Sequence, residues 1–228
     1  MTNQAPPLSG WTVVGGFSIY LITSLALPTL LHQILPEFNI LQLIGSFTTL
    51  ILIILFSQQQ GIWKPKAHIC LWKDTLMAIL FWCASFPIAT LFGSISDWIL
   101  VHVFSIEPHE QLAIYYLKWA TSSPFSMSVA LFSILISAPI VEEILFRGIF
   151  QQWLRRFFGY KHAIFISALA FSLFHFSKDQ GLSNISILLS LFILGGFLGF
   201  LYEKQQSLIA PITLHIIFNA VSVWRILT

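Results

Sequence analysis

FSMSVALFSILISAPIVEEILFRG, residues 125–148, is an apolar run that ends in two adjacent glutamates and an arginine. About 20 apolar residues are enough for a helix to cross a bilayer, so this stretch predicts a transmembrane segment. Burying one unpaired carboxylate in such a setting is costly, and burying two side by side costs more. Glu142 and Glu143 are therefore expected to have partners or a chemical role.

The composition of the whole chain agrees with a membrane protein. Of its 228 residues, 57% are hydrophobic and 9% are charged, whereas an ordinary soluble domain is about 25% charged. The low share of charged residues excludes a soluble globular protein. It indicates an all-α, polytopic transmembrane helical bundle embedded in the lipid bilayer. The net charge of +2 is too small to indicate binding to nucleic acid.

Seven segments are long and apolar enough to be membrane-spanning helices. They are residues 11–31, 38–57, 74–101, 125–156, 161–178, 184–203 and 208–227. The first three contain almost no ionisable groups within their spans, so we interpret residues 1–124 as scaffold helices. Residues 125–228 contain the intramembrane charges and are the expected catalytic core.

Basic residues cluster in two segments that two of these helices separate. The first segment holds Lys64, Lys66 and Lys73, and the second holds Arg155, Arg156 and Lys161. The segment between the two helices holds Glu107 and Glu110 and suits the opposite side of the membrane. Because basic loops stay on the cytoplasmic side, we expect a multi-pass protein of the plasma (cell) membrane with a cytoplasmic N-terminus.

Helical spacing separates the roles of the two glutamates. Glu143 and Arg147 are four residues apart with the acid first, which is the favourable order for an ion pair on one helix. Glu142 lies about 100° around the helix from Glu143 and has no such neighbour. A carboxylate without a local partner is available to act as a general base.

A turn at Gly159 predicts which residue faces Glu142. Glu142 lies 17 residues before Gly159, and His175 lies 16 residues after it. In an antiparallel helical hairpin, equal distances from the turn give equal depth, so these two side chains are expected to lie level. His215 and Asn219 share one face of the last helix, and His215 reaches the same depth if the hairpin end projects into the interface.

Three short motifs lie on these three helices. EEILFR fits the pattern E-E-x-x-x-R, FSLFH fits F-x-x-x-H, and HIIFN fits H-x-x-x-N, in that order along the chain. Together they resemble the CAAX protease and bacteriocin-processing (CPBP) family of intramembrane proteases, relatives of the Rce1-type, type II CAAX prenyl-protein endopeptidase. The resemblance extends from Glu142 to Asn219 and does not include the first 120 residues.

This resemblance implies an endopeptidase that hydrolyses peptide bonds of membrane-associated, prenylated or leader-type peptide substrates. Glu142 and His175 would activate water, and His215 and Asn219 would stabilise the oxyanion. The supporting residues would be Glu143, Arg147 and Phe171, with Phe171 forming a wall of the site. GGFLG, which begins at Gly195, adds a face of small residues that permits close helix packing.

Two questions stay open at the level of sequence. The first is the cofactor, which is either absent or a zinc ion. A zinc ion would take Glu142, His175 and His215 as ligands. The chain has no H-E-x-x-H motif, and we favour metal-free hydrolysis. The second is the function itself, for which the alternatives are a non-catalytic membrane partner and a proton-coupled transporter. The transporter is an alternative because intramembrane Glu and His residues also form proton relays.

Overall fold

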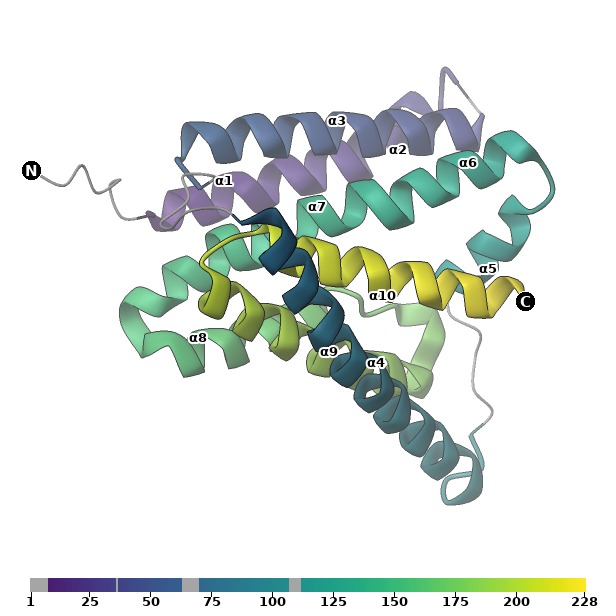
Figure 1. The fold of residues 1–228 in the computed structure, drawn as a ribbon. Helices are drawn as coiled ribbons and strands as arrows, with labels where there is room; N and C mark the ends of the chain where they lie inside the picture. The colour runs from purple at the N-terminus through teal and green to yellow at the C-terminus, as the bar shows by residue number, and fades with distance from the viewer. Residues whose placement is uncertain (1–7, 36, 63–69, 107–111) are drawn as a thin grey trace, which may run out of the picture.

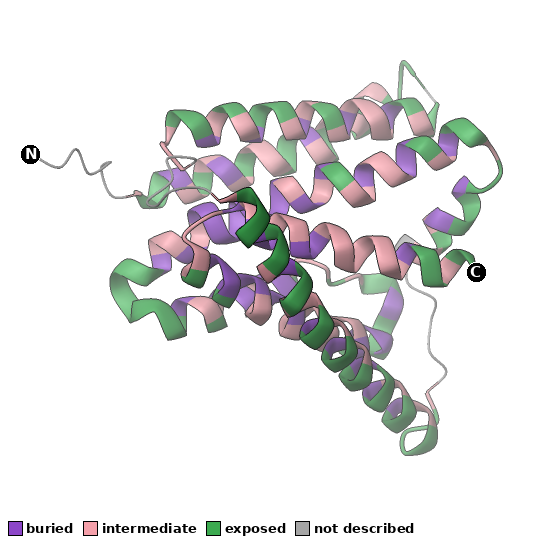
Figure 2. Cartoon of the chain, viewed as in Figure 1, coloured by how far each residue is buried: buried purple, intermediate pink, exposed green. Residues whose placement is uncertain are grey.

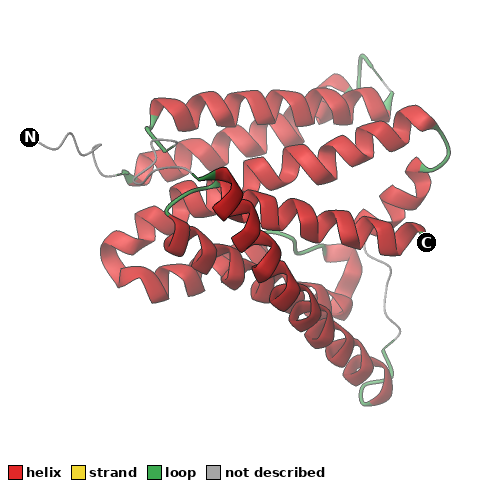
Figure 3. Cartoon of the chain, viewed as in Figure 1, coloured by secondary structure: helices red, strands yellow, loops and turns green. Residues whose placement is uncertain are grey.

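The computed structural model describes residues 8–35, 37–62, 70–106 and 112–228. Over these residues the chain is helical, without strands (Figure 3). Lys64, Lys66, Glu107 and Glu110, which support the predicted orientation, lie outside the described residues. Six described helices are long and apolar enough to cross a membrane: Gly10–Leu31, Phe38–Gln59, Leu71–His102, Pro124–Leu173, Lys178–Gln205 and Ile209–Leu227.

The fourth of these spans contains a helical hairpin. Its last part, α8 (Gln152–Leu173), reverses direction at Gly159, where φ is +70° and ψ is 173°. Figure 1 shows α8 folding back on itself there, as only a residue without a Cβ does readily. The hairpin turn is therefore where the sequence predicts it, and the described residues form an all-α bundle with six helices of membrane-spanning length.

The helical elements follow one another along the chain as Figure 1 shows. The first span consists of α1 (Gly10–Leu21), a π-helical turn η1 (Ile22–Ala26) and α2 (Leu27–Leu31). The second and third are α3 (Phe38–Gln59) and α4 (Leu71–His102), followed by α5 (Leu112–Ala120). The fourth begins with α6 (Pro124–Phe132), η2 (Ser133–Ser137), α7 (Ala138–Glu143) and η3 (Ile144–Gln151), of which η2 and η3 are π-helical. After α8 come the 3₁₀ turn η4 (Lys178–Ser183), α9 (Asn184–Gln205) and α10 (Ile209–Leu227).

The predicted helix 161–178 is wrong at its C-terminal end, because α8 stops at Leu173. Ser177 is extended (φ −118°, ψ 124°), and its backbone N–H donates to Asn184 Oδ1 at 3.0 Å. Asn184 Nδ2 donates in turn to the carbonyls of Ser177 (2.7 Å) and Gly181 (2.8 Å). This buried asparagine satisfies the backbone groups of a non-helical stretch, so His175 lies just beyond the helix and not within it.

Leu8, the first described residue, lies at the same end of the bundle as the Gly159 turn. The guanidinium of Arg156, next to that turn, donates to the carbonyl of Leu8. Thr12 Oγ1 donates to Gln60 Oε1 at 3.1 Å, which brings the end of α3 to the same place. The first described residues, the end of α3 and the start of the Gly159 turn therefore lie at one end of the bundle.

Residues 141–149 of the fourth span are buried throughout, whereas the Gly159 turn of the same span is exposed (Figure 2). In Pro124–Leu173, 61% of the most apolar window is buried, against 39% or less in the other spans. One core cluster joins Ile53 of α3 with Val141, Ile144 and Phe171. Apolar side chains on the outer faces of the spans are exposed, as lipid contact requires.

The helix pair α8–α9 is packed closely through a glycine. A Cβ at Gly195 would lie 3.1 Å from Ala168 Cα and 3.3 Å from Phe171 Cδ1. A Cβ at Gly199 would lie 2.7 Å from Gln151 Oε1. The small-residue face predicted from GGFLG is therefore confirmed, and it holds Phe171 against α9.

Gly195→Ala is expected to lower the free energy of unfolding by about 1–3 kcal/mol, because the new methyl group meets backbone that cannot turn away. The matched control is Gly196→Ala, since a Cβ there meets nothing within 4 Å and Ala has the higher helix propensity. Thermal unfolding in detergent micelles, followed by circular dichroism, compares the two variants. Equal melting temperatures would contradict the close packing of α8 on α9.

Candidate active site

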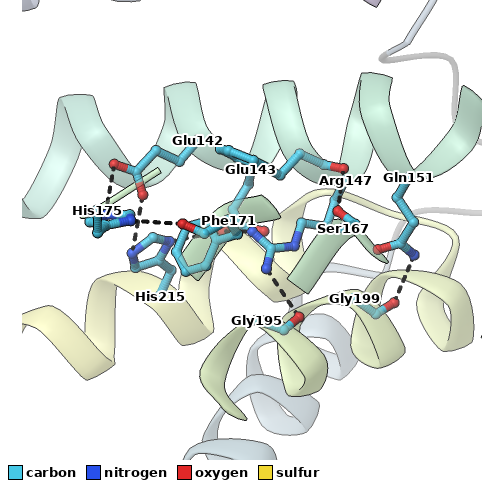
Figure 4. Close-up of polar contacts among 11 residues, drawn as sticks. Glu142, Glu143, Arg147, Gln151, Ser167, Phe171, His175, Gly195, Gly199 and His215 are labelled. Atoms are coloured by element: carbon cyan, nitrogen blue, oxygen red, sulfur yellow. Dashed lines mark hydrogen bonds and ion pairs between the residues drawn. The ribbon is translucent and has the colours of Figure 1, made fainter. Parts of the chain in front are cut away.

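The two glutamates and the arginine lie at the junction of α7 and η3 (Figure 4). Arg147 Nη1 donates to Glu143 Oε1 at 3.0 Å, and both side chains are fully buried. Arg147 Nη2 donates to the carbonyl of Gly195 on α9, also at 3.0 Å. The predicted ion pair is therefore confirmed, and it also ties η3 to the neighbouring helix.

Phe171 stands between this ion pair and two histidines. Its ring centroid lies 4.5 Å from Arg147 Cζ, a cation–π distance. The ring is fully buried and meets the rings of His175 (5.0 Å between centroids) and His215 (5.8 Å) in edge contacts. Phe171 thus forms a wall against both imidazoles, which is where the sequence reasoning places it.

His175 follows the end of α8 and faces Glu142. Its Nδ1 lies 2.9 Å from the carbonyl of Phe171, and because a carbonyl only accepts, Nδ1 carries a proton. In the neutral ring Nε2 is then an acceptor, and it lies 3.8 Å from Glu142 Oε1. The prediction that Glu142 and His175 lie at equal depth is confirmed.

His215 reaches the same carboxylate from α10. Its Nδ1 lies 2.9 Å from Glu143 Oε1, and its Nε2 lies 3.8 Å from Glu142 Oε2. Glu143 therefore has two partners, Arg147 and His215, whereas the sequence indicated only Arg147. The outcome is that each oxygen of Glu142 faces the Nε2 atom of a different histidine (Figure 4).

Asn219 lies one turn beyond His215 and contacts the π-helical turn η2. Its Nδ2 donates to the carbonyl of Ile134 at 3.0 Å. That carbonyl lacks the usual helical donors, because the N–H of Ala138 donates to Ser133 and residue 139 is a proline. One N–H of Asn219 is thus used structurally, and the second is available to a ligand.

Glu142 also borders a cavity of about 280 Å³. The cavity lies between α1–α2, α3 and the η2–α7 segment, and only 8% of the surface of Glu142 is exposed. Sequence reasoning missed its polar wall, which includes Tyr20, Ser24, Gln42, Ser46 and Thr49. Their spacings, 20 and 24 and then 42, 46 and 49, repeat at the helical period on apolar helices, and this pattern could have found them.

The donor atoms beside Glu142 are of the types that zinc takes, and both histidines have Nδ1 held by an acceptor as metal ligands often do. Their placement does not fit a metal centre, however. In the part of the chain that the structure describes, no group of three or more His, Cys, Asp or Glu side chains is arranged to hold a metal ion.

Comparison with protein families finds a match within the chain. The family model for "Type II CAAX prenyl endopeptidase Rce1-like" proteins matches residues 124–221. This range contains Glu142, His175, His215 and Asn219 but none of α1 to α5. No curated protein and no solved structure matches the chain significantly.

Proposed function

We propose that this chain, whose residues 124–221 match the family model for type II CAAX prenyl endopeptidase Rce1-like proteins, is an intramembrane endopeptidase acting on membrane-associated or leader-type peptides. The observation that carries the proposal is the meeting of two imidazole Nε2 atoms with the two oxygens of one buried carboxylate, at 3.8 Å each. These distances are too long for direct hydrogen bonds. They leave room for a water molecule that contacts all three groups.

In this proposal Glu142 and His175 activate the water. The water donates one hydrogen bond to a Glu142 oxygen and the other to His175 Nε2. That nitrogen can accept because the proton of the neutral ring is on Nδ1, which donates to the carbonyl of Phe171. A lone pair of the water then points at the carbonyl carbon of the substrate. As the C–O bond forms, Glu142 takes the proton, which is general-base catalysis.

His215 and Asn219 would stabilise the oxyanion that results. Asn219 supplies the N–H that Ile134 does not use. His215 donates from Nε2 only as an imidazolium, because Nδ1 already carries the proton shared with Glu143. When the intermediate collapses, the C–N bond breaks and Glu142 returns its proton to the leaving nitrogen.

The remaining residues hold these groups in position. Glu143 fixes the ring of His215 through a hydrogen bond to Nδ1. Arg147 fixes Glu143 and also donates to the carbonyl of Gly195 on α9. Phe171 limits the movement of both imidazole rings. In this proposal residues 125–228 form the catalytic part, the N-terminus is cytoplasmic, and the membrane is the cell membrane.

The test compares peptides from membranes and medium of cells carrying the native protein, Glu142→Gln or the exposed control Glu37→Gln, at matched protein levels. We expect new peptide termini, seen by mass spectrometry, that Glu37→Gln retains and Glu142→Gln loses. Adding a chelator to purified membranes should not stop these termini from forming. Identical profiles for all three proteins would favour a non-catalytic partner or a transporter.

Asn219→Ala is expected to lower kcat by about 10²–10³-fold, the usual cost of losing one oxyanion donor. It also leaves the Ile134 carbonyl unpaired, which should cost about 1–3 kcal/mol of folding stability. Measuring kcat, KM and unfolding temperature together separates the two effects. The control is Ser222→Ala, one turn further along α10, where the hydroxyl bonds only to Phe218. A kcat near the native value with reduced stability would leave Asn219 a purely structural role.

A further inference from the structure

The cavity beside Glu142 is built mostly by helices outside the family match. Its walls come from α1–η1–α2 and α3 on one side and from η2–α7 on the other, and Figure 1 shows these helices lying together. The match to the family begins at residue 124. Properties of the cavity therefore come largely from residues that the family resemblance does not include.

The lining includes several small hydroxyl side chains beside apolar ones, which is unusual inside a bundle of apolar helices. Ser24 Oγ donates to the carbonyl of Tyr20, and Ser46 and Ser133 share a hydrogen bond of 2.9 Å. Hydroxyls that donate their proton within the wall keep lone pairs to accept from a ligand. Gln42, which has no hydrogen-bond partner among the described residues, adds both a donor and an acceptor.

Each wall of the cavity contains a π-helical turn. The π-helical turn η1 ends two residues before Pro28, and η2 ends two residues before Pro139. A proline removes one backbone donor and crowds the preceding turn, and single π turns within helices often occur at functional sites. Ser24 and Ser133 both lie in these turns and both line the cavity.

The cavity borders Glu142, whose Oε1 lies 3.8 Å from His175 Nε2. Tyr20 lines the cavity, and its ring packs on Phe174, whose centroid is 5.2 Å away and which precedes His175 in the chain. Glu142 forms part of the opposite wall. A ligand in the cavity therefore lies next to Glu142, the proposed general base.

We infer that this cavity binds a short, extended, unprenylated peptide segment with small side chains, adjacent to the bond that is cleaved. Inside a membrane the N–H and C=O groups of an extended peptide need partners, and the hydroxyls and the Gln42 carboxamide provide them. An isoprenoid chain would cover the same polar groups without replacing their hydrogen bonds. The volume of about 280 Å³ lies just below the range of about 300–1,000 Å³ that suits drug-sized ligands, so only a few small residues fit.

This inference rests on the proposed function, and a binding assay separates the two. The probes are fluorescent ten-residue peptides in detergent micelles with a central Ala-Gly-Ala-Ser or Leu-Phe-Leu-Phe, and farnesylcysteine methyl ester as competitor. Binding is measured on the Glu142→Gln protein, so that cleavage does not interfere. Ser24→Leu fills the cavity, Gln42→Leu keeps its volume but removes its polar groups, and Ser18→Leu on the exposed face of α1 is the control.

We expect the small-residue peptide to bind at least tenfold more tightly than the Leu-Phe peptide. Ser24→Leu and Gln42→Leu should each weaken its binding about tenfold or more, and Ser18→Leu should not. Farnesylcysteine methyl ester should not compete. Competition by that ester, failure of both peptides to bind, or equal affinity in all variants would overturn the inference. Binding as expected without cleavage by the native protein would instead overturn the proposed peptidase function.

Discussion

Purified Glu142→Gln protein is expected to lose about 10²–10⁴-fold in kcat, the contribution typical of a general base. The amide has the same shape as the carboxylate but cannot take a proton from water. KM and the unfolding temperature should stay near their native values, because Glu142 has no direct hydrogen bond to either histidine at 3.8 Å. Cleavage of a peptide identified from cells, followed by mass spectrometry, provides kcat and KM.

A second substitution at the same position sharpens this result. Glu142→Asp keeps the charge but withdraws the oxygens from the two Nε2 atoms, so kcat should fall while some activity remains. Glu37→Gln, at an exposed carboxylate that immediately precedes α3, controls for loss of negative charge. Native-like kcat in Glu142→Gln would mean that another group activates the water.

Features that depend on local helix geometry could be predicted from the sequence. Glu143 and Arg147 are four residues apart on one helix, and that spacing alone places them together. Glu142 and His175 are nearly equidistant from Gly159, so a hairpin brings them level whatever surrounds it. The presence of several membrane-spanning helices followed from lengths of apolar sequence, which the bilayer thickness fixes.

Features that depend on packing between distant helices could not be predicted. The bond between His215 and Glu143 depends on how α10 is rotated against α7. The contact of Asn219 with Ile134 depends on a π-helical turn whose backbone pattern is not visible in the sequence. The interpretation of residues 1–124 as scaffold considered charged groups only, so it overlooked the hydroxyls of Ser24 and Ser46 in the cavity wall.

Arg147→Met is expected to give the largest loss of stability. It leaves Glu143 buried with His215 as its remaining partner, and removing one member of a buried ion pair costs about 3–5 kcal/mol. The variant also loses the hydrogen bond to the Gly195 carbonyl and the contact with the Phe171 ring. Thermal unfolding in detergent micelles should show a much lower melting temperature, with activity lost at temperatures where the variant is still folded.

The double variant Glu143→Gln/Arg147→Met distinguishes an unpaired charge from simple loss of packing. Removing both charges should recover part of the stability, because no buried carboxylate is then left without its counter-ion. Activity should not return, since a neutral carboxamide at position 143 cannot hold the ring of His215 as the carboxylate does. The exposed Arg156→Met should change stability by about 0.5 kcal/mol or less. If the double variant were no more stable than Arg147→Met, the contacts of Arg147 with α9 and Phe171, and not its charge, would account for the loss.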